Sequence, residues 1–184
     1  MSSPLVNIPP LFAVLVGIGK YENFEPLVSA ADDAHKIFTF LTTKLGVPSK
    51  NITTLYDSDA TKANILDAIS SLPQKPNFNR NDAILFFFSG YAGQAKLESD
   101  EYDKEATVGM ICPADIHQQS GIADKTLVQL FDQMSKSCGN NIVSNDNSKR
   151  LETEAFRAGL DRSSGLRVRP LYVGLSAFLR RRRT

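Results

Sequence analysis

The apolar positions of the first 140 residues follow two periods that alternate along the chain. Continuous apolar runs rich in β-branched and aromatic residues are typical of strands covered on both faces. These runs are "LFAVLVGI" (11–18), "NITTLY" (51–56) and "DAILFFFSG" (82–90), with a shorter extended segment at 106–115. Between the strands, apolar residues at helical spacing predict helices over 29–46, 60–72 and 123–137. The alternation indicates an α/β fold, a sheet with right-handed parallel crossovers and helices on both faces.

The ends of the predicted strands are where a site is expected. Ligands of open α/β sheets bind beyond the carboxyl ends of the parallel strands. The third run, "ILFFFSGYAGQ", passes abruptly from large apolar residues into Ser89-Gly90-Tyr91. The first run passes into the loop 17–21, "GIGKY". We therefore expect Tyr91 and this loop to lie at the same edge of the sheet.

Composition and charge narrow the class of protein. The chain has 184 residues, 42% of them hydrophobic and 22% charged, which is the profile of a globular domain. The net charge of +1 predicts no partner among nucleic acids. After residue 142 the alternation stops, and nine arginines lie between Arg150 and Arg183. We therefore expect a domain over 1–142 and an irregular basic segment over 143–184.

Cysteine usage and leader features predict a cytoplasmic protein without a membrane span. Two cysteines, Cys112 and Cys138, form neither a disulfide framework nor a metal-ligand spacing. The apolar stretch 11–18 lacks the basic flank and cleavage site of a signal peptide. The glycines at 17 and 19 lack the third glycine of a dinucleotide-binding turn, so no cofactor is predicted.

Several segments, taken in order, resemble the caspase-like peptidases and most closely their metacaspase branch. The resemblance covers about Phe12 to Ile142. It rests on "FAVLVGIGKY", "LVSAADDA", "LGVPSKNITTLYD", "ATKANILDAI", "DAILFFFSG", "MICPAD", "GIADKTLVQLFDQM" and "GNNI". It implies a caspase-like, mostly parallel sheet flanked by helices, incomplete here at its C-terminal part. By resemblance the activity is that of a cysteine-type endopeptidase, linked to cell-death or stress proteolysis and acting on peptides or proteins.

Two residues on which that chemistry depends are altered. The family's catalytic histidine follows Ser-Gly at the end of the third strand, and here that position is Tyr91. A phenol titrates near pH ~10 and is a poor base for a thiol at neutral pH. After "GNNI" the family continues into a strand and a cysteine motif. This chain continues as "VSNDNSKRLETEAF", with no cysteine after Cys138, so both strand and nucleophile are expected to be missing.

Two other sites are implied by the resemblance. Asp33 and Ser89 match the pocket in which metacaspases hold an Arg or Lys side chain, although Ala30 stands where a cysteine is usual. Asp33 is equally consistent with a first-turn helix carboxylate favoured by the helix dipole. The acidic run 98–105 could suggest calcium, but Lys125 replaces an aspartate of the family's paired acidic site. We therefore expect no bound metal.

The sequence thus predicts a non-catalytic metacaspase-like domain with a binding or regulatory role. Its partners would be peptides, proteins or caspase-like relatives that pair with a sheet edge left open by the missing strand. The alternative is an active endopeptidase cleaving after Arg or Lys, with an unconventional dyad of His117 and Cys138. Cys112 is expected to be a buried strand residue. A third possibility is a chain too incomplete to fold well.

Overall fold

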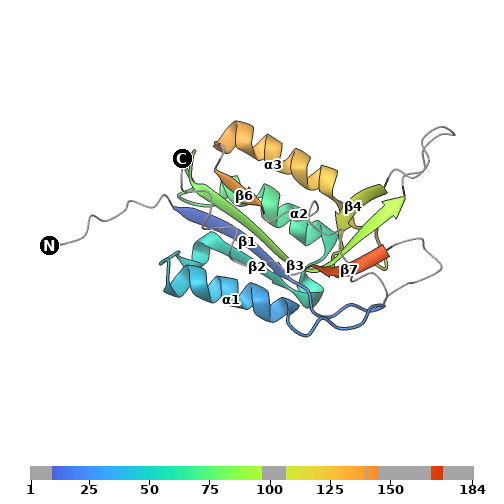
Figure 1. Ribbon diagram of the computed structural model, residues 1–184. Helices are drawn as coiled ribbons and strands as arrows, with labels where there is room; N and C mark the ends of the chain where they lie inside the picture. The colour runs from blue at the N-terminus through green and yellow to red at the C-terminus, as the bar shows by residue number, and fades with distance from the viewer. Residues whose placement is uncertain (1–9, 97–106, 140, 145–166, 172–184) are drawn as a thin grey trace, which may run out of the picture.

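The computed structural model describes residues 10–96, 107–139, 141–144 and 167–171. It has the predicted alternation of strands and helices (Figure 1). The strands are β1 (Leu11–Gly17), β2 (Ile52–Tyr56), β3 (Ala83–Lys96), β4 (Thr107–Ile111), β5 (Ile122–Ala123), β6 (Ile142–Ser144) and β7 (Arg167–Leu171). The α-helices are α1 (Ala30–Thr43), α2 (Lys62–Ser70) and α3 (Asp124–Cys138). Short 3-10 turns occupy Ser49–Asn51, Asp57–Asp59 and Leu72–Gln74.

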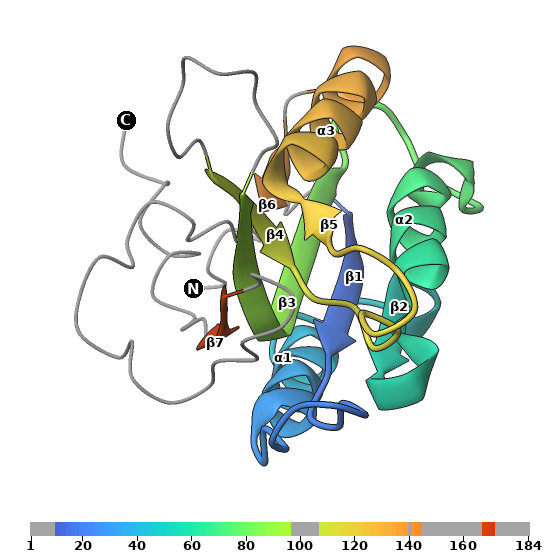
Figure 2. The same ribbon diagram turned by 90° about the vertical axis from the view of Figure 1, so that its right-hand side faces the viewer.

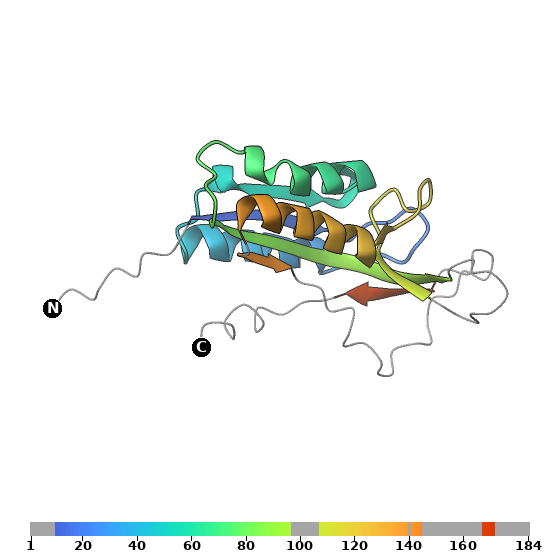
Figure 3. The same ribbon diagram turned by 90° about the horizontal axis from the view of Figure 1, so that it is seen from above.

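The sheet is parallel at one end and antiparallel at the other. β1 lies between β2 and β3 and is parallel to both, and β6 is parallel to β3 over Ile84–Phe86. Beyond the end of β1, β3 pairs antiparallel with β4 and, through residues 90–94, with β7. Seen from above, β6 and β7 follow one edge of β3 while β1 follows the other (Figure 3). β3 therefore crosses the whole domain and links both parts of the sheet.

The predicted end of the third strand at residue 90 is wrong. β3 continues through Tyr91 to Lys96 because residues 92–96 form a ladder with residues 107–111. The small residues Gly90, Ala92 and Gly93 mark the change from parallel to antiparallel neighbours. Tyr91 consequently lies within a strand, and its backbone is held on both sides.

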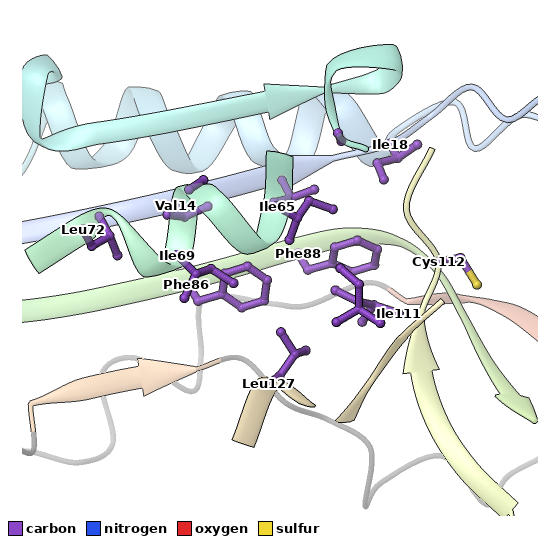
Figure 4. Close-up of a cluster of buried hydrophobic side chains, with 14 of the residues drawn as sticks. Val14, Ile18, Ile65, Ile69, Leu72, Phe86, Phe88, Ile111, Cys112 and Leu127 are labelled. Atoms are coloured by element: carbon purple, nitrogen blue, oxygen red, sulfur yellow. The ribbon is translucent and has the colours of Figure 1, made fainter. Parts of the chain in front are cut away.

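Helices cover both faces of the sheet and bury two hydrophobic clusters. In Figure 2, α2 and α3 lie on one face and α1 on the other. Even-numbered residues of β1 and β3 pack against α2 and α3, and odd-numbered residues pack against α1, as the two-residue period of a strand requires. Figure 4 shows the first cluster, which includes Val14, Ile65, Ile69, Phe86, Phe88, Ile111 and Leu127.

The first helix approaches the end of β1 very closely. A Cβ placed on Gly17 would lie 2.7 Å from Ala34 Cβ and 2.8 Å from the Ala30 carbonyl oxygen. Only glycine admits this contact without a shift of the helix. Gly17 therefore fixes where the first turn of α1, including Asp33, lies relative to the carboxyl ends of the parallel strands.

The second helix begins at a cap that is only partly visible in the sequence. Thr61 is the N-cap and accepts a hydrogen bond from the Asn64 amide at 3.2 Å. Asp115, which follows β4, also accepts from the Lys62 amide at 2.9 Å. The Ala114 amide donates to the Ala60 carbonyl oxygen at 2.9 Å. The segment after β4 thus anchors the start of α2.

The strand that was expected to be missing is present in its first residues. Ile142–Ser144 form β6 in parallel register with Ile84–Phe86 of β3. Of the segment 143–184, the structure describes 143–144 and 167–171, and both stretches pair with β3. The proposed division at residue 142 stays a prediction. In the part of the chain that the structure describes, no helix combines the length and apolarity needed to cross a bilayer.

Candidate functional site

Tyr91 lies where β3 passes the carboxyl end of β1, and its side chain is tied to the loop that follows β1. Its phenol donates a hydrogen bond to the Glu25 carbonyl oxygen at 3.1 Å. Its ring packs edge-on against Tyr21, with centroids 5.1 Å apart, and tilted against Phe24 at 5.3 Å. The half-buried tyrosine is therefore packed into a cluster of aromatic rings at the position implied for a catalytic histidine.

Tyr21 links the backbones of three segments at this point. Its hydroxyl accepts a hydrogen bond from the Tyr91 amide at 3.0 Å and donates one to the Cys112 carbonyl oxygen at 2.9 Å. The Cys112 amide donates in turn to the Tyr91 carbonyl oxygen at 2.8 Å. Burial raises the pKa of the Tyr21 phenol well above its ordinary value, so the hydroxyl remains a donor.

The loop between β1 and α1 is held by further polar contacts. Asp57 Oδ1 accepts from the amides of Gly19 and Lys20 at 2.8 and 3.0 Å. The Leu27 amide donates to the Gly19 carbonyl oxygen at 2.7 Å. Farther along, Glu22 Oε2 lies 2.5 Å from His117 Nε2. The loop is thus bound to the turn after β2 and to the segment after β4, and through Tyr21 to β3.

Ser89 and Asp33 belong to the α1 side of the sheet. Ser89 pairs with Gly17, against which α1 packs. Its side chain is fully buried, and Oγ has no hydrogen-bond partner among the described residues. Asp33 lies in the first turn of α1, 30% exposed, with Lys36 Nζ 3.1 Å from Oδ1. The implied pocket residues are therefore placed at the same end of α1 and β3.

Both cysteines of the chain are buried. Cys112 follows β4 and is fully enclosed, as predicted, and burial raises the pKa of its thiol to about 12. Cys138 is the last residue of α3 and is 4% exposed, because the helix ends only at Gly139, whose φ is +92°.

The alternative dyad of His117 and Cys138 does not form. The Cys138 carbonyl oxygen accepts from the Asn81 amide, just before β3 begins, at 2.7 Å. His117 contacts Glu22, which follows the end of β1. Because β1 and β3 are parallel, these two places are opposite ends of the strands. The imidazole and this thiol are therefore separated by the length of the sheet.

The acidic residues considered for calcium are only partly described. The run 98–105 lies outside the described residues. Lys125 stands in the first turn of α3, where its ammonium group repels a cation. In the ranges that the structure describes, no group of three or more His, Cys, Asp or Glu side chains could hold a metal ion.

A mixed sheet between helical layers, parallel around β1 and with its candidate site where β3 passes the end of β1, defines a caspase-like peptidase fold. The chain belongs to the metacaspase family: the model of the metacaspase peptidase C14 domain matches residues 12–145. It is 34% identical over 119 residues to Metacaspase-1 of Kluyveromyces lactis and 34% identical over 122 residues to Metacaspase-1 of Candida glabrata. These matches cover 61% and 62% of this chain but only 27% and 30% of the relatives.

A solved structure supports the fold alone. The crystal structure of protein GSU0716 from Geobacter sulfurreducens superposes with a TM-score of 0.55 at 19% sequence identity. The match covers 74% of this chain and 48% of that one. The fold and family predicted from the sequence are thus confirmed, while the roles of Tyr91, Asp33 and Ser89 stay predictions.

Three residues that shape the site were not predicted to do so. Tyr21, Asp57 and Asp115 each bind backbone groups of a distant segment through one side chain. Each comes shortly after a strand, which is the only sequence feature that could have indicated them. Their backbone partners lie 37 to 91 positions away, and no local pattern encodes such a contact.

Proposed function

We propose that this chain is a non-catalytic metacaspase-like domain of the cytoplasm that binds peptides or proteins and regulates proteolysis in cell death or stress. The observation that carries the proposal is the state of the two groups needed for thiol catalysis. Tyr91 stands in place of the base, and its hydroxyl donates to the Glu25 carbonyl oxygen. Neither Cys112 nor Cys138 is exposed.

The thiol nearest to Tyr91 is unsuited to nucleophilic attack. Cys112 is joined to Tyr91 through the backbone, yet its side chain has no exposed surface. With a pKa of about 12, its thiolate amounts to about one molecule in 10⁵ at neutral pH. Since the thiolate is the nucleophile, catalysis through Cys112 is disfavoured because its thiol is both inaccessible and protonated.

The outer edge of β3 supports a binding role. Ile84 donates its amide to the Asn141 carbonyl oxygen on this edge, whereas Ser89 presents its carbonyl to Ile18 on the β1 side. In this part of β3, the even-numbered residues therefore point their amide and carbonyl groups toward the edge away from β1. Phe88 is one of these residues. Among the described strands, β6 pairs only as far as Phe86 and β7 begins at Gly90. A strand from a peptide or a caspase-like relative could pair at Phe88.

The chemistry beside this edge favours a basic side chain. Ser89 Oγ is a buried acceptor with no partner among the described residues, and Asp33 supplies a carboxylate at the start of α1. The exposed contact of Asp33 with Lys36 is weak, so a guanidinium can displace it. We therefore propose an extended segment carrying Arg or Lys as the ligand.

Two assays test the proposal. Fluorogenic peptides ending in Arg or Lys should show no turnover with the purified chain. Turnover that disappears in Cys112→Ala or Cys138→Ala would overturn the non-catalytic assignment. Binding is measured separately by fluorescence anisotropy, with a labelled peptide containing one arginine and a matched peptide in which citrulline removes the charge.

The binding assay has a control within the same helical turn. The arginine peptide should bind at least several-fold more tightly than the citrulline peptide. Asp33→Asn should abolish this difference, whereas Asp32→Asn should keep it, because Asp32 is exposed in the same turn and is not predicted to line the pocket. Equal affinity of the two peptides, or an unchanged preference in Asp33→Asn, would contradict the basic-ligand proposal.

A further inference from the structure

We infer that Tyr21 is the positioning residue of the candidate site, and that Gly90 is present to admit its hydroxyl. Tyr21 is separated from Tyr91 by 70 positions, yet its Oη is the acceptor for the Tyr91 amide. The same oxygen donates to the Cys112 carbonyl oxygen. One buried hydroxyl, in a residue only 8% exposed, thereby fixes the main chain at the position implied for the catalytic base.

The reason for glycine at position 90 is steric. A Cβ placed there would lie 2.6 Å from Tyr21 Oη and 2.8 Å from Cζ of Phe88. Gly90 is not among the glycines with positive φ, which are Gly46 and Gly139. Its backbone conformation is therefore open to any residue, and what it supplies is space for the tyrosine hydroxyl.

This contact joins two sequence features that are far apart. The turn after β1 ends in Tyr21, and the small pair Ser89-Gly90 precedes Tyr91 in β3. The Tyr21 hydroxyl occupies the space that a side chain at position 90 would fill. The direction in which side chain 91 leaves β3 is thus set by Tyr21, whichever residue occupies that position. The positioning role of Tyr21 does not depend on the proposed function.

Hydrogen exchange at single amides tests the positioning role. In Tyr21→Phe the amide of Tyr91 loses its acceptor, and its exchange should accelerate at least tenfold relative to the amide of Phe87 in the same strand. Its ¹⁵N–¹H resonance should also shift. A purely global loss of stability would accelerate both amides equally. An unchanged ratio between the two amides would overturn the inference.

A double-mutant cycle tests the steric part. In the native background, Gly90→Ala should raise the unfolding equilibrium constant at least tenfold, because the new methyl group overlaps with Tyr21 Oη and with the Phe88 ring. In the Tyr21→Phe background the overlap with Oη is gone, so Gly90→Ala should raise the constant by a clearly smaller factor. Gly17→Ala is the matched control, because its overlap is with α1, and its factor should be the same in both backgrounds. Equal factors for Gly90→Ala in the two backgrounds would overturn the steric explanation. If Gly90→Ala does not fold, the exchange experiment on Tyr21→Phe still decides the positioning role.

Discussion

The two halves of β3 are held in place by different physical means. Residues 83–89 have parallel neighbours and helices on both faces, and residues 84–88 carry large apolar side chains. Residues 90–96 have antiparallel neighbours and small or polar side chains. Among them, Tyr91 is positioned by donating its amide to Tyr21 Oη and its phenol to the Glu25 carbonyl oxygen. The first half supplies the stability of the domain through burial. The side chain at position 91 in the second half can change at lower cost in stability than a core residue of the first half, so the fold persists with a tyrosine there.

The largest expected effect lies in the first half. Phe86 is 3% exposed, and its ring packs tilted against Phe131 with centroids 5.7 Å apart. Phe86→Ala should lower the free energy of unfolding by about 3–5 kcal/mol, because it removes apolar area and leaves a cavity. Urea denaturation followed by circular dichroism measures the change. Val128→Ala is the control, since Val128 is 49% exposed and should change stability by less than about 0.5 kcal/mol.

A cooperative urea transition would also exclude the third possibility raised by the sequence, a chain that cannot fold stably. If the native chain unfolds gradually and Phe86→Ala behaves like Val128→Ala, the first half of β3 is not the stable region that its packing indicates. The two halves of the strand would then not differ in how much stability they supply.

The two halves of β3 also differ in how well the sequence predicts them. The run 84–88 is apolar throughout, so strand, burial and neighbours follow from local pattern. Residues 90–96 have no such pattern, and their pairing with residues 107–111 depends on contacts that a local window cannot contain. The helix predicted over 123–137 ends one residue before Cys138 for a similar reason. The sequence around Cys138 is polar, but burial of Cys138 against the core and the cap at Gly139 keep it in α3.

The titration of two buried groups near Tyr91 should have an intermediate effect on the free energy of unfolding. Burial raises the pKa of Cys112 to about 12 from an ordinary value near 9, and it raises the pKa of Tyr21 as well. In both cases the neutral form is favoured in the folded state. The folded state therefore keeps these protons where the unfolded state loses them, and stability falls as pH rises above about 9.

The expected loss is about 1–2 kcal/mol between pH 7 and pH 10, with most of it from Cys112. Urea midpoints at several pH values measure it. Cys112→Ala should start from a lower stability but show a flatter dependence on pH, and Cys138→Ala should keep the native dependence. A native chain whose stability is constant from pH 8 to pH 10 would show that water reaches this region, contrary to its burial.

The smallest expected effect is at Tyr91 itself. Tyr91→Phe keeps the ring contacts with Tyr21 and Phe24 but removes the donor to the Glu25 carbonyl oxygen. It should therefore lower the free energy of unfolding by about 0.5–1.5 kcal/mol. The loss should appear as faster amide exchange in residues 22–27, with little change in β1.

Tyr91→His also loses part of the ring packing, and it should remain without peptidase activity because Cys112 and Cys138 stay buried. A Tyr91→His variant that hydrolyses Arg-ending peptides would show that a thiol can reach position 91, and the second half of β3 would then be a catalytic site lacking only its base.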